Sequence, residues 1–350
     1  MLSTMKKLFI LGPCAAESRE QVLTIAESLS AETDIIFRSG IWKPRTSPSS
    51  FQGVGENGLP WLQEVNERYK LPCATEVATP EHLQAALRAG IQYIWIGART
   101  SANPIAVQAI ADALSARSAV FQPQAVLIKN PVNEDVNLWI GNIERLQATS
   151  LPVMAVHRGC NHKPCWAMAF ELRRRKPEVQ LLLDPSHMSG NAAKVPALCQ
   201  LAMNLDYDGL MIEVHNDPAN ALSDAKQQLT PAQTIDIIKN LKYRDNSQLL
   251  TTAAGATSLY SKHSTLNLVE LRFEIDELDD ELWDLIAQRV AIARKIGDYK
   301  REHNMPVLQV KRYDEILQRR IEWAKKNGVS VDAVQSILET LHNECVSVQL

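Results

Sequence analysis

The sequence predicts a (β/α)8 barrel followed by an all-α domain of three helices. Between residues 8 and 242, short apolar runs alternate with amphipathic segments, which is the order of a repeated βα unit. The apolar runs lack strict alternation, as expected for strands buried on both faces of a parallel sheet. After residue 242 the chain becomes polar and aperiodic, and a stripe of leucines with helical period then begins.

The predicted strands are short. In order they begin at Leu8, Asp34, Leu71, Tyr93, Ala125, Pro152, Val179 and Asp208. Helix-opening signals lie between them, such as Thr79-Pro80 and Thr230-Pro231, in which a capping residue precedes a proline in the first turn. Eight such units in about 240 residues favour a closed barrel. A doubly wound open sheet is the second interpretation, but no Gly-x-Gly-x-x-Gly follows any of these runs.

Polar side chains follow the predicted strands at the ends where barrel enzymes carry their chemistry. In order these residues are Cys14, Arg38, Glu76, Arg99, Lys129, Arg158, His187 and Glu213. Exposed loops explain one or two charged strand ends, but less easily four cations, a thiol and an imidazole. If the strands close into a ring, all of these side chains converge on one mouth, which we predict to be an active site.

The segment "RSGIWKPRTSPSSFQG" places three cations around the rigid Pro44, with Arg38 and Lys43 before it and Arg45 after it. The mouth is therefore expected to hold small anions. We predict three binding groups: Arg99, Lys129 and Arg158 for a phosphate, Arg38 with Lys43 for a carboxylate, and Arg45 with Thr46 for a second phosphate. Such a site would bring two anionic substrates together.

A divalent metal site is predicted from one thiol, one imidazole and two carboxylates: Cys14, His187, Glu213 and Asp224. Mixed soft and hard ligands suit Mn, Fe, Co or Zn better than Mg or Ca, and such an ion would polarise a carbonyl. Each residue also has an ordinary interpretation, for example Glu213 as an ion-pair partner of Arg158. Cys160 and Cys165 flank His162, but this pattern lacks a second cysteine pair and does not predict a zinc site.

Composition excludes several classes of protein. The 350 residues carry 37 basic and 40 acidic side chains and a formal charge of -3, which disfavours nucleic acid as a partner. Gly12 and Pro13 interrupt the first apolar run too early for a signal peptide or a membrane span. The six cysteines form no disulfide framework, which is typical of a cytoplasmic protein.

The chain beyond the barrel is predicted to be helical. We expect a barrel over residues 1–243, a linker over 244–263 and a helical domain over 264–350. Its apolar stripe, Leu268, Leu271, Ile275, Leu278, Leu282 and Leu285, marks a helix of roughly 35 residues that ends before Pro306. Two helices follow, from Val307 to Lys326 and from Val331 to Val348. A helix that long cannot bury its stripe on two short partners, so we expect a homodimer.

Two cations interrupt the stripe. Arg289 and Lys300 are eleven positions apart, which places them on one face of the helix. Unpaired buried charge is costly, which argues for an anionic ligand. The alternative, in which both side chains extend to solvent from an exposed edge, stays open at this point.

Eight motifs in the first two thirds of the chain carry a family resemblance: "GPCAAES", "KPRTSPSSFQG", "TEV", "IGART", "LIKNP", "HRG", "DPSHMSG" and "DGLMIEVH". In this order they resemble 3-deoxy-D-arabino-heptulosonate 7-phosphate (DAHP) synthase, from about residue 8 to residue 242. The resemblance implies that phosphoenolpyruvate condenses with erythrose 4-phosphate in an aldol-like step: C3 of the enol attacks the metal-polarised aldehyde, water adds at C2, and phosphate leaves.

The resemblance also implies roles for individual residues. The metal ligands are Cys14, His187, Glu213 and Asp224; Arg38, Lys43, Arg99, Lys129 and Arg158 hold phosphoenolpyruvate, and Arg45 with Thr46 holds the phosphate of erythrose 4-phosphate. Glu76 lies near the reacting carbon. Lys43 is the candidate for proton transfer, because a lysine among cations is expected to have a lowered pKa. The sister enzyme 3-deoxy-D-manno-octulosonate 8-phosphate synthase is the alternative, but it usually has an Asn-containing loop in place of Lys43-Pro44-Arg45-Thr46.

The segment "LRFEIDELDDELWDLIAQRVAIARKIGDYKREHNMPVLQVKRYDEIL" resembles the all-helical chorismate mutase domain. The resemblance implies a site of Arg272, Arg289, Lys300, Arg312 and Gln349, with Arg272 reaching into the second subunit of a dimer. Chorismate rearranges to prephenate without acid or base, and Lys300 with Gln349 would stabilise charge on its ether oxygen. Gln309 and Tyr313 depart from the acidic residues of well-known members.

The main hypothesis is therefore a bifunctional enzyme with a bound divalent metal, Mn first and Co, Fe or Zn as alternatives. Chorismate or prephenate bound to the helical domain is expected to inhibit the barrel. The alternative is a monofunctional DAHP synthase whose tail is a metabolite-sensing dimerisation module.

Overall fold

A computed structural model describes residues 7–31, 34–45, 47, 49–116, 121–243, 268–307 and 310–349. The chain divides into two compact units, Met1–Thr252 and Ala253–Leu350. The predicted linker and Gln309 lie outside the described residues, and the predicted domain boundaries stay predictions. No helix in the described ranges is long and apolar enough to cross a membrane.

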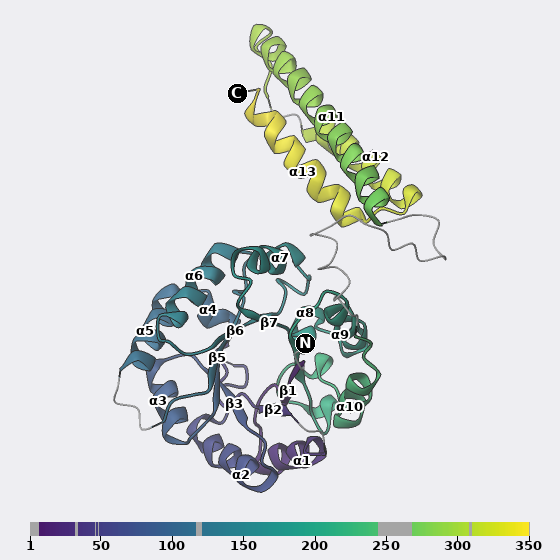
Figure 1. Cartoon of the computed structure of the whole chain (residues 1–350). Coiled ribbons are helices and arrows are strands. Elements are labelled where there is room, and N and C mark those ends of the chain that lie inside the picture. Colours follow the sequence, from purple (N-terminus) through teal and green to yellow (C-terminus); the bar gives the residue numbers. More distant parts are fainter. Residues whose placement is uncertain are drawn as a thin grey trace. The chain divides into compact units, whose positions relative to one another are not determined.

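The first unit is a closed barrel of parallel strands (Figure 1). The strands are β1 (Leu8–Gly12), β2 (Ile35–Arg38), β3 (Cys73–Val77), β4 (Tyr93–Ile96), β5 (Ala125–Lys129), β6 (Val153–His157), β7 (Gln180–Leu183) and β8 (Gly209–Glu213). Each pairs with the next in the sequence, and β8 pairs with β1, from Leu8 opposite Gly209 to Gly12 opposite Glu213. The barrel prediction is confirmed and the open sheet is excluded.

Helices surround the barrel, as Figure 1 shows. They are α1 (Arg19–Leu29), α2 (Leu59–Tyr69), α3 (Pro80–Arg88), α4 (Ala98–Ser101), α5 (Pro104–Ser115), α6 (Val136–Gln147), α7 (Trp166–Arg175), α8 (Pro185–Ser189), α9 (Val195–Asn204) and α10 (Pro231–Asn240). Short 3-10 turns are η1 (Gly55–Gly58), η2 (Ala192–Lys194), η3 (Pro218–Asn220) and η4 (Ala225–Gln227). Thr79 and Thr230 cap α3 and α10 as the sequence predicts, and Thr230 forms a capping box with Gln233.

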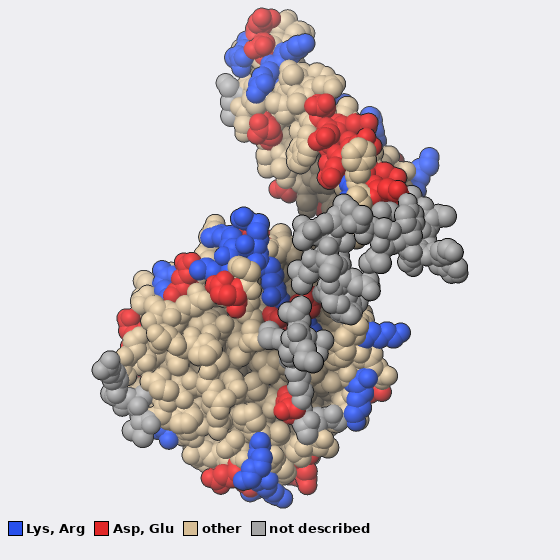
Figure 2. Space-filling view, viewed as in Figure 1, with Lys and Arg blue, Asp and Glu red and all other residues tan. Residues whose placement is uncertain are grey.

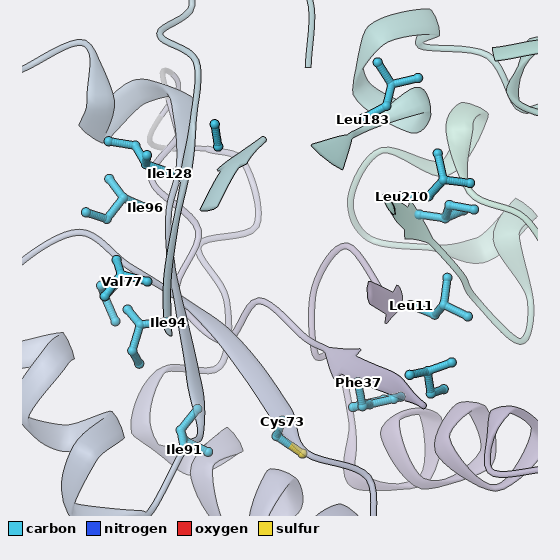
Figure 3. Packing of buried hydrophobic residues seen from close by; sticks show 14 of the residues in the cluster. Leu11, Phe37, Cys73, Val77, Ile91, Ile94, Ile96, Ile128, Leu183 and Leu210 are labelled. Atoms are coloured by element: carbon cyan, nitrogen blue, oxygen red, sulfur yellow. The ribbon is translucent and has the colours of Figure 1, made fainter. Parts of the chain in front are cut away.

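Buried side chains form two layers. One residue from each strand fills the inside of the ring: Ile10, Ile36, Ala74, Trp95, Leu127, Val156, Leu182 and Met211. The strand residues that alternate with these, among them Leu11, Phe37, Ile94 and Ile128, pack outward in the larger cluster beneath the helices (Figure 3). Because this alternation is regular, the residue two positions after each inward one enters the barrel mouth.

The second unit contains three helices in its described part: α11 (Leu268–Glu302), α12 (Val310–Asn327) and α13 (Val331–Ser347). Their positions agree with the predicted helices, and α11 has the predicted 35 residues. The buried residues of α11 are Ala293, Gly297 and Lys300. The leucine stripe is exposed within the chain, for example Leu278 at 64% and Leu282 at 50%. The described part of this unit therefore does not cover the stripe.

Charges are mixed over the visible surface. Figure 2 shows the Lys and Arg residues of the barrel in small groups with Asp and Glu nearby, rather than in one continuous basic surface. At the end of α7, for example, Arg173 pairs with Asp208 at 2.8 Å and Arg174 with Glu171 at 2.6 Å. This distribution agrees with the near-neutral net charge.

Candidate active sites

The barrel mouth is built from the residues two positions after the inward layer. From β2, β3, β5, β6, β7 and β8 they are Arg38, Glu76, Lys129, Arg158, Asp184 and Glu213. Strands β1 and β4 contribute Gly12 and Gly97 instead, followed by Cys14 and Arg99. The mouth holds a cavity of about 190 Å³. It is lined by Arg38, Lys43, Pro44, Arg45, Glu76, Ala98, Arg99, Lys129, Val132, Arg158, His162, His187, Asp224 and Gln227.

The four side chains predicted to bind metal lie together. One ligand atom from each of Cys14, His187, Glu213 and Asp224 lies within 4.8 Å of the others. Cys14 Sγ is 2.9 Å from Asp224 Oδ2, and His187 Nε2 is 3.5 Å from Glu213 Oε1. They converge because β1, β7 and β8 are neighbours in the ring. Among the described residues, Cys160, His162 and Cys165 form no such group.

The chemistry of this set fits a divalent cation. Burial raises the pKa of the Cys14 thiol, and the nearby Glu213 carboxylate raises it further. Burial also acts to raise the pKa of Asp224, but His187, the hydrogen bond from Cys14 and the nearby cations hold it below its usual range. A thiol, an imidazole and two carboxylates around one point favour a cation that replaces the thiol proton. These four residues can therefore hold a divalent metal ion.

Lys43 lies beside the predicted metal ligands. Its buried Nζ donates to Cys14 O at 3.0 Å and to Cys14 Sγ at 3.1 Å. Burial alone would lower the pKa of Lys43, but Cys14, Glu76 and Glu213 outweigh burial and Arg38, so the pKa is raised. The prediction of a lowered pKa for Lys43 is therefore wrong. It considered the cations adjacent in the sequence, whereas the fold surrounds Lys43 with acidic groups.

Arg38 has donors left for a ligand. The side chain is only 1% exposed, its Nη2 pairs with Glu213 Oε1 at 3.2 Å, and its guanidinium lies 4.9 Å from the ring centre of Trp95. Thus Glu213 pairs with Arg38 rather than with Arg158. Nε and Nη1 of Arg38 are buried without a hydrogen-bond partner in the described part of the chain. Since buried donors are normally satisfied, a substrate oxygen is the natural acceptor.

The remaining predicted cations also line the cavity. Arg99 lies on α4, and Arg158 follows β6 with its backbone N–H bound to Asn130 Oδ1 at 2.7 Å. Arg45 Nη1 is 3.6 Å from Asp224 Oδ2. Thr46 lies outside the described residues. Lys129, 4% exposed, donates to Asp184 Oδ2 at 2.7 Å.

Three residues near the site were missed by the sequence reasoning. Asp184 binds both Lys129 and His187, Gln227 Nε2 donates to Glu213 Oε2 at 2.7 Å, and Gly97 provides the space that Glu76 occupies. A Cβ on Gly97 would lie 2.0 Å from Glu76 Oε1. The strand register was the available signal for Asp184 and Gly97, because both are two residues beyond an inward apolar residue.

In the helical unit, Lys300 and Gln349 are brought together. Lys300 is buried and its Nζ donates to Gln349 Oε1 at 2.8 Å, so this lysine does not extend to solvent. Arg289 Nη1 donates to Leu341 O at 3.0 Å and to Cys345 Sγ at 2.7 Å. Gln349 Nε2 donates to the carbonyl of Cys345 at 2.8 Å, which connects these side chains along the end of α13.

The other predicted mutase residues lie apart from this group. Arg272 is on the exposed first half of α11, and Arg312 is exposed and pairs with Glu315 at 3.1 Å. Tyr313 packs on His342 with ring centres 4.5 Å apart. Burial lowers the pKa of His342, and Arg289 and Lys300 lower it further, so His342 lies within the field of the two predicted site cations.

Together, the fold and the barrel mouth define a (β/α)8 enzyme suited to anionic substrates and a divalent metal. Comparison with known families matches residues 4–249 to the DAHP synthetase I family and residues 271–350 to chorismate mutase type II. The chain belongs to the DAHP synthetase I family and carries a chorismate mutase domain, which makes it a bifunctional enzyme of the shikimate pathway.

Individual relatives are similar to one or the other part of the chain. The phospho-2-dehydro-3-deoxyheptonate aldolase of Thermotoga maritima is 31% identical over 241 residues, covering 67% of this chain and 68% of the relative. A crystal structure of the Thermotoga maritima DAHP synthase superposes with a TM-score of 0.60 and 26% identity over 71% of this chain and 70% of that one. The T-protein of Haemophilus influenzae is 36% identical over 77 residues, 22% of this chain and 20% of the relative. A 2-dehydro-3-deoxyphosphooctonate aldolase of Desulfatibacillum aliphaticivorans is 27% identical over 67% of this chain and 90% of the relative.

Proposed function

We propose that the barrel condenses phosphoenolpyruvate with erythrose 4-phosphate and that the helical domain rearranges chorismate to prephenate. One observation carries the barrel proposal: four ligand atoms lie within 4.8 Å of one another at a cavity that is lined by Arg38, Lys43, Arg45, Arg99, Lys129 and Arg158. A metal set beside so many cations suits a reaction between two anionic substrates.

The proposed roles follow from position. Cys14, His187, Glu213 and Asp224 bind the metal, which we propose to be Mn2+, with Co, Fe or Zn as alternatives. When bound, the ion would supply Lewis-acid polarisation of the aldehyde carbonyl. Arg99, Lys129 and Arg158 hold the phosphate of phosphoenolpyruvate, and Arg38 with Lys43 holds its carboxylate. Arg45 with Thr46 holds the phosphate of the aldose.

We propose that Lys43 binds substrate as a cation and does not transfer a proton. Its raised pKa keeps the ammonium protonated near neutral pH, so it can donate hydrogen bonds to substrate oxygens but is unsuited to proton transfer. Glu76, whose carboxylate lines the same cavity, is the proposed acidic residue near the reacting carbon.

The choice of aldose is tested by a direct comparison. Purified enzyme loaded with Mn2+ is assayed for phosphate release from phosphoenolpyruvate with erythrose 4-phosphate and, separately, with arabinose 5-phosphate. We expect kcat/KM to be at least about 100-fold higher for erythrose 4-phosphate, since a misplaced reacting group costs on this order. A preference for arabinose 5-phosphate would instead favour the alternative, the 3-deoxy-D-manno-octulosonate 8-phosphate synthase reaction, to which the 2-dehydro-3-deoxyphosphooctonate aldolase relative points.

For the mutase, we propose that Arg289, Lys300, Arg312 and Gln349 of one chain and Arg272 of a second chain surround chorismate. The exposed leucines on the first half of α11 support a homodimer, because an apolar stripe of that length is normally covered. Prephenate formation by the full-length enzyme, with Lys300→Met as the inactive control, tests this role. A wild-type chain without mutase activity would favour a sensing and dimerisation module.

We also propose that chorismate or prephenate, bound by the helical domain, inhibits the barrel. The support is that one chain carries both domains of one pathway. Titrating prephenate into the condensation assay should inhibit wild type and should inhibit Lys300→Met much less. Equal inhibition of the two proteins would place the inhibitor in the barrel.

A further inference from the structure

Asp184 is a buried carboxylate that contacts both a proposed metal ligand, His187, and a proposed phosphate ligand, Lys129. It follows β7 two residues after the inward Leu182 and is 0% exposed. Its Oδ1 accepts the backbone N–H of His187 at 3.0 Å. Its Oδ2 accepts from His187 Nδ1 at 2.8 Å and from Lys129 Nζ at 2.7 Å. One oxygen atom thus joins a proposed metal ligand to a proposed phosphate ligand.

We propose that Asp184 is a positioning residue that couples binding of the metal to binding of phosphoenolpyruvate, through its shared contacts with His187 and Lys129. This inference rests on the proposed function of the barrel.

The contact with His187 fixes the imidazole. An ionised carboxylate only accepts hydrogen bonds, so Nδ1 of His187 must carry a proton, and Nε2 is the ring nitrogen that can bind a cation. Nε2 is the atom that faces Glu213 Oε1 at 3.5 Å, within the ligand group. A carboxylate behind a ligating histidine orients the ring and raises its basicity.

The contact with Lys129 places a counter-charge beside a buried ammonium. Lys129 has three donors, and in the described chain only the one directed at Asp184 has a hydrogen-bond partner. The other two are available to a ligand in the cavity that Lys129 lines. Without Asp184 this cation would be buried without a counter-charge, which is strongly unfavourable.

The shared oxygen gives the coupling a sign. A cation held by His187 would strengthen the hydrogen bond from Nδ1 to Asp184 Oδ2. That oxygen would then have less negative charge for Lys129, whose ammonium would be freer to bind a phosphate. Metal and phosphoenolpyruvate should therefore favour each other, and the factor must be the same in both directions.

The test compares wild type with Asp184→Asn in the full-length chain. Asparagine is a good helix cap, so the cap of α8 is kept while the charge is removed. The matched control is Asp135→Asn, a capping aspartate of α6 whose Oδ1 accepts from Leu138 N at 2.9 Å. The dissociation constant of Mn2+ is measured by electron paramagnetic resonance of free Mn2+, with and without saturating phosphoenolpyruvate.

In wild type and in the control, phosphoenolpyruvate should tighten Mn2+ binding. In Asp184→Asn, Mn2+ should bind roughly 10- to 100-fold more weakly, and the tightening by phosphoenolpyruvate should shrink at least about threefold. An unchanged affinity or an unchanged tightening in Asp184→Asn overturns the inference and leaves the proposed function intact. Failure of wild type to bind either Mn2+ or phosphoenolpyruvate overturns both.

A measurement on wild type alone covers the case in which Asp184→Asn does not fold. Nitrogen-15 NMR of metal-free protein with labelled histidine, assigned by comparison with His187→Gln, reports which nitrogen of His187 is protonated. Nδ1 is expected to carry a proton. A ring protonated on Nε2 alone would overturn the inference, because Nδ1 would then not donate to Asp184.

Discussion

Replacing Gly97 by alanine should disable the barrel site without unfolding the protein. Gly97 has an ordinary extended backbone, φ -72 and ψ 163, so alanine fits the main chain. Its Cβ would lie 2.0 Å from Glu76 Oε1, whereas ordinary contacts begin at 3.4 Å, so the carboxylate must retreat by about 1.4 Å (3.4 minus 2.0). Because the end of a flexible side chain can move, stability should change by less than about 1 kcal/mol.

The substitution should instead lower the rate of the condensation reaction. A displacement of about 1 Å of a catalytic group can reduce a rate about 100-fold, or about 2.7 kcal/mol at 1.36 kcal/mol per factor of ten. Phosphate release gives kcat/KM, and thermal unfolding gives stability. Gly141→Ala is the matched control, because its Cβ would approach only the flexible end of Arg145, with Nη1 at 3.3 Å, away from the barrel mouth, and the condensation rate should not change.

The pairing of Gly97 with Glu76 gives a sharper test. Glu76→Gln alone should lose activity, and adding Gly97→Ala to it should cost much less than in wild type, because the two changes act on one carboxylate. A Gly97→Ala enzyme within about threefold of wild-type kcat/KM would refute the reasoning, since Glu76 could then not require its present position.

Other changes address stability, the mutase and the dimer. Burial lowers the pKa of His157 to about 4, against an unfolded value of 6.5, so the free energy of unfolding should fall by about 3 kcal/mol as pH drops from 6.5 to 4. Urea unfolding at the two pH values should show a smaller fall for His157→Gln than for wild type. Equal falls in the two proteins would contradict this. A Cβ on Gly297 would lie 2.7 Å from Gln349 Cα, so Gly297→Val should lower mutase kcat/KM more than tenfold and spare the condensation rate; loss of both activities would argue against a local effect. Leu278→Glu with Leu282→Glu should convert a dimer to monomers in light scattering, and an unchanged mass would exclude this face of α11 as the interface.

The barrel and the helices could be predicted because their patterns are local. Buried parallel strands read as apolar runs, and the register of two residues then carries Arg38, Lys129 and Glu213 into the mouth. The length of the first of these helices followed from the leucine stripe and from Pro306. Cysteine and histidine stood out as candidate ligands because few other residue types bind soft metals.

The features of the site that the sequence did not predict depend on contacts between residues from different strands. Asp184 reads as an ordinary helix cap three residues before His187, and nothing local shows that Lys129 reaches the same oxygen. The pKa of Lys43 was misjudged for the same reason, since the thiol and carboxylates that raise it come from β1, β3 and β8. Gly97 reads as a turn residue until Glu76 is seen beside it.

The barrel rim separates its two proposed phosphate sites by strand. The residues proposed to hold the enol phosphate lie at the ends of β4, β5 and β6, whereas Arg45 lies in the segment after β2. The positions from Arg45 onward can therefore change during evolution to accept an aldose of another length, while Arg38, Lys43 and the residues at the ends of β4, β5 and β6 stay as they are. Relatives named for seven-carbon and eight-carbon sugar products fit such a history, in which substrate range diversified by editing a single segment of an inherited rim.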